Sequence, residues 1–64
     1  MNKAMTVLLE YQHKDKIRKA LLREYNDDYI IEYYYYDNLY DKQIFTDTDL
    51  EKIKEIVYSW SIGQ

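Results

Sequence analysis

The sequence predicts an α+β fold with the order β-α-β-β-α, in which a three-stranded mixed sheet carries two helices packed on one face. Three observations lead to this prediction. A short apolar stretch near the N-terminus alternates with period two, two other segments show helical spacing of apolar residues, and a region rich in tyrosine and isoleucine is split by a turn-forming pair. At 64 residues the chain has room for a single domain, residues 1–64.

The first element is predicted to be a strand over residues 6–11. Its side chains alternate between Val7, Leu9, Tyr11 and Thr6, Leu8, Glu10, which is typical of a strand with one face buried more fully. A short helix within residues 4–12 remains the alternative. Residues 1–12 are too short and too interrupted by charge for a secretory or membrane segment, so we expect a cytoplasmic protein with no membrane contact.

The second element is predicted to be an amphipathic helix over residues 14–25. Apolar side chains recur there at helical spacing, at Ile17, Ala20, Leu21 and Tyr25, and basic side chains occupy another side, at Lys16, Lys19 and Arg23. The polar residues 26–28 end it. Such a segment is long enough for a right-handed crossover, which would make the first two strands parallel.

The third and fourth elements are predicted to form a hairpin within residues 28–45, with its turn at Asp37-Asn38. A two-residue or a four-residue loop gives the same register, which pairs Tyr35 with Tyr40, Tyr33 with Lys42, and Ile31 with Ile44. One face, assigned to the core, then carries Tyr29, Ile31, Tyr33, Tyr35, Tyr40, Lys42 and Ile44. The other face, assigned to solvent, carries Ile30, Glu32, Tyr34, Tyr36, Leu39, Asp41, Gln43 and Phe45.

The last element is predicted to be a helix that begins at a capping box. Thr48 would accept a hydrogen bond from the first turn, and Glu51 would reach back to the cap. The apolar stripe of this helix is Leu50, Ile53, Ile56, Val57 and Trp60. Gly63 is expected to end it.

This order of elements resembles the DinI-like family of small proteins that bind the RecA recombinase filament. The resemblance rests on residues 5–11 as first strand, residues 29–46 as hairpin, and residues 46–60, where a threonine and acidic residues accompany an Ile, Ile, Trp stripe. It implies a βαββα fold and a C-terminal helix whose carboxylates imitate DNA phosphate. The chain departs from the family pattern because Lys52 and Lys54 interrupt these acids and the tail, residues 59–64, has no acid.

The sequence offers little for catalysis, and we predict that the protein is not an enzyme and uses no metal or cofactor. It has no cysteine and one histidine, His13, which is interpreted as a solvated loop residue. Asp47, Asp49 and Glu51 have the spacing of a calcium loop but lack its glycine and later glutamate, and helix capping explains them. A single glycine leaves no phosphate-binding loop.

Charge is divided along the chain. Residues 13–23 carry five basic side chains and one acid, whereas residues 24–51 carry nine acids and one lysine. This polarity predicts a non-enzymatic modulator that binds a host protein and inhibits a nucleic-acid-handling or defence factor, by occlusion or DNA mimicry in an anti-CRISPR-like or DinI-like way. Residue types with AT-rich codons point to a phage or mobile element. The predicted partner-binding residues are Glu32, Tyr34, Tyr36, Asp41, Gln43, Asp47 and Asp49.

Two alternatives stay open. Lys16, Lys19 and Arg23 would contact phosphate in a nucleic-acid-binding accessory protein, although a net charge of −3 disfavours direct binding to nucleic acid. A small domain with a strongly β-forming hairpin would also suit a self-assembling structural component or a homodimer.

Overall fold

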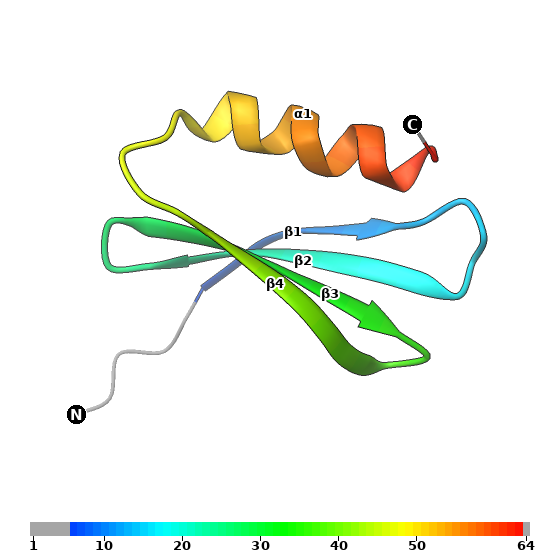
Figure 1. Ribbon diagram of the computed structural model, residues 1–64. Coiled ribbons are helices and arrows are strands. Elements are labelled where there is room, and N and C mark those ends of the chain that lie inside the picture. The colour runs from blue at the N-terminus through cyan, green and yellow to red at the C-terminus, as the bar shows by residue number, and fades with distance from the viewer. Residues whose placement is uncertain (1–5, 64) are drawn as a thin grey trace.

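The computed structural model describes residues 6–63, which form four strands followed by one helix (Figure 1). The elements are β1 (Thr6–Gln12), β2 (Arg18–Tyr25), β3 (Asp28–Tyr35), β4 (Asn38–Phe45) and α1 (Leu50–Ser61). Each strand pairs antiparallel with the next, so the sheet has the order β1-β2-β3-β4. The helix lies across one face of this sheet (Figure 1). The predicted β-α-β-β-α fold, with a three-stranded mixed sheet and two helices, is therefore wrong.

The main correction concerns β2, which replaces most of the helix predicted over residues 14–25. Ala20 and Leu22 are fully buried beneath α1, while Leu21 and Arg23 alternate with them and point to the other side of the sheet. Because β2 has a strand on each side, its outward Leu21 is also partly covered. The consecutive apolar residues Ala20, Leu21 and Leu22 are therefore compatible with a helix as well as with a central strand.

The hairpin turns in this sheet contain no glycine. Asn26 lies between β2 and β3 with φ 56°, and Tyr36 and Asp37 lie between β3 and β4 with φ 50° and 66°. Positive φ at both central residues is what a type I′ turn requires. The predicted turn at Asp37-Asn38 is therefore one residue too late. The longer loop between β1 and β2, residues 13–17, contains Lys16 with φ 63°.

A β-bulge at Tyr40 determines the register of β4. Tyr33 lies opposite Asp41, and Tyr34 lies opposite Leu39, so Tyr40 is an extra residue between the two pairs. A second irregularity, in β1, accommodates the residue between Val7 and Leu9. The earlier turn and the bulge together shift most of the β4 pairing by one residue from the prediction.

A shift of one residue exchanges the two faces of a strand. Asp41, Gln43 and Phe45 pair with residues of β3 that face the helix, so they lie on the helix side of the sheet rather than on the face assigned to solvent. Lys42 and Ile44, assigned to the core, lie on the opposite side instead. We call this second side the open side, because no element of residues 6–63 covers it.

The helix α1 begins close to the predicted residue, but its cap is different. Its N-cap is Asp49, whose Oδ1 accepts a hydrogen bond from the Glu51 N–H at 3.3 Å. The Thr48 hydroxyl donates instead to the Thr46 carbonyl, so the predicted capping box at Thr48 is wrong. Gly63 follows the helix with φ 84°, in agreement with its predicted role as the terminating residue.

The core lies between α1 and the helix side of β2 and β3. Its buried apolar members are Ala20, Leu22, Ile31, Tyr33, Ile53 and Val57, and partly buried side chains pack around them at Leu8, Tyr11, Tyr29, Phe45, Leu50 and Trp60. The first strand is present as predicted. Residues 1–5, the first part of the N-terminal stretch assessed as a membrane or secretory segment, lie outside the described part of the chain, and residues 6–12 form β1. The single helix of residues 6–63 is not long and apolar enough to span a bilayer.

The observed register of β4 predicts opposite outcomes for two neighbouring substitutions. Phe45→Ala removes a ring packed against the core and should lower the free energy of unfolding by about 2 kcal/mol. Ile44→Ala removes a side chain that is 59% exposed and should cost no more than about 0.5 kcal/mol. Urea unfolding followed by circular dichroism measures both, and a larger loss for Ile44→Ala would contradict the register.

Candidate functional site

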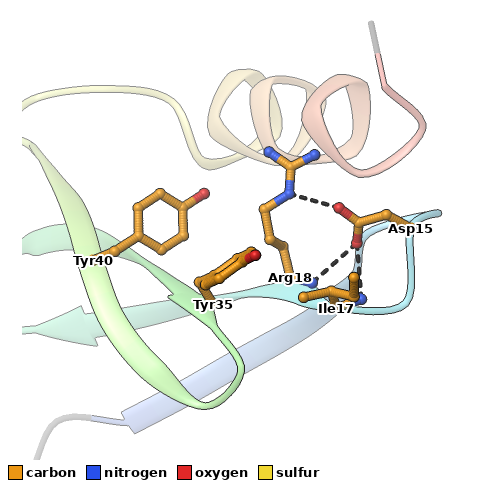
Figure 2. Close-up of a pocket in the computed structure, with 5 residues that line it drawn as sticks. All are labelled: Asp15, Ile17, Arg18, Tyr35 and Tyr40. Atoms are coloured by element: carbon orange, nitrogen blue, oxygen red, sulfur yellow. Dashed lines mark hydrogen bonds and ion pairs between the residues drawn. The ribbon is translucent and has the colours of Figure 1, made fainter.

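Three adjoining depressions lie on the helix side of the sheet, around Trp60 of α1 and Tyr40 of β4. The helix depression is lined by Lys52, Glu55, Ile56, Ser59 and Trp60. The central depression is lined by Tyr33, Tyr40, Asp41, Gln43 and Trp60. The loop depression, drawn in Figure 2, is lined by Asp15, Ile17, Arg18, Tyr35 and Tyr40. Trp60 borders both the helix depression and the central depression, and Tyr40 borders both the central depression and the loop depression. The three depressions therefore form one surface, which we call the aromatic groove.

Tyr33 forms the floor of the central depression. It is 7% exposed, and its hydroxyl donates to Oε1 of Gln43 at 2.7 Å. Its ring centroid lies 5.1 Å from that of Trp60 and 6.3 Å from that of Tyr40, within the range of favourable aromatic pairs. Burial, followed by the nearby Asp41 carboxylate and Tyr40, raises the pKa of Tyr33. The floor is therefore neutral and rigidly held, while Tyr40 is half-exposed at the rim.

The loop depression is built around an ion pair (Figure 2). Oδ1 of Asp15 accepts hydrogen bonds from the N–H groups of Ile17 and Arg18, at 2.8 and 3.0 Å, and its Oδ2 lies 2.6 Å from Nε of Arg18. The hydrogen bond from the Arg18 backbone, with support from Ile17 and the Arg18 side chain, holds the pKa of Asp15 well below its usual range. Figure 2 shows the Arg18 side chain between Asp15 and the rings of Tyr35 and Tyr40.

His13 fixes this loop to the helix, and its predicted role as a solvated loop residue is wrong. It is 6% exposed and its ring meets Trp60 edge to face, with centroids 4.9 Å apart. Nδ1 of His13 lies 3.1 Å from the Asp15 backbone nitrogen, which donates to it. The next residue, Lys14, donates its N–H to the Ser61 carbonyl at 2.8 Å, near the end of α1. The loop and helix walls of the groove are therefore joined behind its surface.

The open side carries a different arrangement, centred on the predicted site residues Glu32 and Tyr34. Nε of Arg23 lies 2.5 Å from Oε1 of Glu32, and the Tyr34 hydroxyl donates to the same oxygen at 2.9 Å. Partial burial opposes ionisation of Glu32, but the hydrogen bonds from Arg23 and Tyr34 outweigh it and lower the pKa of Glu32. Lys19 lies beside this cluster, 3.2 Å from the Asp37 carboxylate and 5.8 Å from the centroid of the Tyr34 ring.

The seven predicted partner-binding residues do not share one surface. Glu32 and Tyr34 lie on the open side, and Asp41 and Gln43 lie in the aromatic groove. The remaining three are at the β3–β4 turn, in the β4–α1 loop and at the helix cap: Tyr36, Asp47 and Asp49. The predicted basic stripe is also divided, because Lys16 lies in the β1–β2 loop while Lys19 and Arg23 lie on β2.

Sequence reasoning missed the residues that shape the groove. Tyr40 and Trp60 were assigned to the core, and Arg18 and His13 had no predicted binding role. The density of tyrosines near the β3–β4 turn was the available signal, but it gave no indication of the bulge that turns Tyr40 toward Trp60. Within residues 6–63, no three His, Asp or Glu side chains gather as a metal-ligand set.

Searches against protein-family models, curated proteins and solved structures found no match for this chain. The DinI-like resemblance is therefore untested by comparison. The element order that it implied is not the one observed, because β2 stands where the first helix was expected.

The Glu32 cluster predicts a specific pH dependence of stability. Because the folded state lowers the pKa of Glu32 below its ordinary 4.5, the resulting stabilisation is present above that pH and is lost as the pH falls through the folded-state pKa. Glu32→Gln should lower the free energy of unfolding at pH 7 by about 1–2 kcal/mol and flatten its decline below pH 4.5. Urea unfolding between pH 7 and pH 3 measures this effect.

The matched control is Glu10→Gln, which changes an exposed glutamate on β1. It should leave both the stability at neutral pH and its acid dependence nearly unchanged. Equal slopes for the wild type and Glu32→Gln below pH 4.5 would show that the cluster contributes no such stabilisation.

Proposed function

We propose that the protein is a non-enzymatic modulator that binds a partner protein in the aromatic groove. The observation that carries this proposal is the concentration of half-exposed rings on a concave surface, with Tyr35 49% and Tyr40 50% exposed. Tyrosine, tryptophan and arginine are the residues that protein interfaces enrich, because they give a large contact area at low entropic cost. Arg18 and Trp60 complete that set in the same groove.

The charge near β4 supports a partner with a basic surface. Asp37, Asp41 and Asp47 lie in the turn before β4, on it, and in the loop after it, and all three are exposed. These acids would steer a basic protein toward the groove and oppose binding to nucleic acid. A host protein that handles nucleic acid, or a defence factor that does so, has the required charge. Occupying its basic surface would inhibit it.

Two other functions have less support. Ion pairs engage Lys19 with Asp37 and Arg23 with Glu32, which weakens both lysine and arginine as phosphate contacts. Charged side chains in the middle of an edge strand, here Asp41 and Lys42, oppose the edge-to-edge pairing that a self-assembling component would use.

The proposal is tested by two adjacent substitutions on β4. Tyr40→Ala should weaken partner binding at least about tenfold, equivalent to roughly 1.4 kcal/mol, because it removes the ring shared by two depressions. Leu39→Ala removes a side chain of similar exposure outside the groove and should leave affinity within about twofold. Affinity capture from host lysate with mass spectrometry identifies the partner, and titration calorimetry with the purified partner then compares the variants.

Circular dichroism and urea unfolding show whether both variants keep the fold. Equal partner affinity for the wild type and a folded Tyr40→Ala protein would remove the groove as the binding surface. A loss with Leu39→Ala alone would move the site to the open side.

A further inference from the structure

The central depression of the aromatic groove has the composition of a site for an organic cation. Tyr33, Tyr40 and Trp60 supply its aromatic walls, and Asp41 supplies a carboxylate. Its volume of about 240 Å³ is below the roughly 300 Å³ at which sites for whole small molecules begin, so it suits one side chain. Aromatic rings attract a cation through their negative faces, and the attraction grows when water is partly excluded.

The charge of Asp41 is available to a ligand. Its Oδ1 accepts the backbone N–H of Lys42 at 2.8 Å, and none of the ion pairs formed within residues 6–63 involves it. The influence of its carboxylate on Tyr33 is consistent with a position beside the floor of the depression.

The neighbouring lysines and arginines are not among the residues that line the central depression. Arg18 borders the loop depression, on the other side of Tyr40, and is engaged by Asp15. Lys52 borders the helix depression, and Lys42 lies on the open side of β4. An anionic ligand would meet the Asp41 carboxylate without a lysine or arginine among the lining residues to offset it.

We propose that the central depression binds the cationic end of a lysine or arginine side chain of the partner protein. The Asp41 carboxylate forms the ion pair, and the rings of Tyr40 and Trp60 contact the cation and its apolar stem. This inference rests on the proposed function, because it takes the partner to be a protein and names the side chain that anchors it. The extended stem of either residue allows the charge to reach Asp41 while the partner backbone stays above the rim.

Trp60 makes the site directly observable, since it is the only tryptophan in the chain and borders the depression. The probes are N-acetyl-arginine amide, N-acetyl-lysine amide and the neutral arginine isostere N-acetyl-citrulline amide. Titration should change the Trp60 fluorescence saturably with the two cations, and at least fivefold more weakly with citrulline. The ratio between the arginine and lysine probes identifies which side chain the site prefers.

Two conservative variants separate the depression from general charge attraction. Asp41→Asn should weaken binding of both cationic probes at least fivefold, because it removes the carboxylate and keeps the side-chain shape. Asp27→Asn makes the same change at an exposed acid in the β2–β3 turn and should leave the affinity within twofold. Tyr40→Leu, at a half-exposed position, should weaken binding while the circular dichroism spectrum is retained.

The proposal is overturned if citrulline amide binds as well as arginine amide, if Asp41→Asn keeps the wild-type affinity, or if Asp27→Asn weakens binding as much as Asp41→Asn does. Partner binding that is lost with Tyr40→Ala but unaffected by Asp41→Asn overturns the cationic anchor and leaves the groove as the protein-binding surface. Probe binding that depends on Asp41, together with partner binding that is insensitive to Tyr40→Ala, supports the cation site and overturns the proposed function.

Discussion

One α-helix has to cover one side of a four-stranded sheet, and the rest of the structure follows from the mismatch in width. A helix with its side chains is about 10–12 Å across, whereas four strands about 4.8 Å apart make a sheet about 19 Å wide. The helix α1 packs closest to β1 and β2 and buries Ile53 and Val57 in the core. A strip of the helix side along β4 is left without a covering element among residues 6–63, and the central depression of the aromatic groove lies there. The side chains that line it have to tolerate water, which tyrosine, tryptophan and glutamine do.

On the open side, polar side chains cover the centre of the sheet. Arg23 and Glu32 on adjacent central strands form a largely buried ion pair, and Glu32 also accepts a hydrogen bond from the Tyr34 hydroxyl. The apolar stems of these long side chains cover part of the sheet. Each partner satisfies the other, and neither leaves an unpaired charge against the sheet. The two sides of the sheet therefore differ in kind. The open side presents a charge-compensated cluster together with exposed aliphatic side chains such as Leu39 and Ile44, and the helix side presents exposed rings with an acidic side chain beside them.

Parts of the fold could be predicted from the sequence because the signals were local. The apolar stripe of Ile53, Val57 and Trp60 identified α1, and the alternation of Ile31 and Tyr33 with Glu32 and Tyr34 assigned the faces of β3. The strand β2 could not be assigned in this way, since a central strand is partly buried on both faces and loses its period-two pattern. A left-handed turn at Tyr36 and Asp37 has neither the glycine nor the asparagine that usually marks it.

The error in the predicted register of β4 affected the candidate site more than it affected the fold. The earlier turn alone would have moved the pairing by two residues and kept the faces of β4. The unpredicted bulge at Tyr40 reduces this to a net shift of one residue, which exchanges them. Asp41 and Gln43 thereby moved from the Glu32 cluster to the neighbourhood of Trp60. Sequence reasoning identified the right kind of residues, acids and tyrosines near this hairpin, and placed them in the wrong combinations.

Because of the bulge at Tyr40, the shape of the aromatic groove can change without a change in the rest of the fold. Removing this one codon would let the ladder between β3 and β4 run regularly, with Asn38 still opposite Tyr35 and Asp41 still opposite Tyr33. A single insertion into a regular hairpin would thus add a ring to the aromatic groove without disturbing the core. Deleting the same codon would remove that ring as simply, so the shape of the aromatic groove can change while the architecture stays the same.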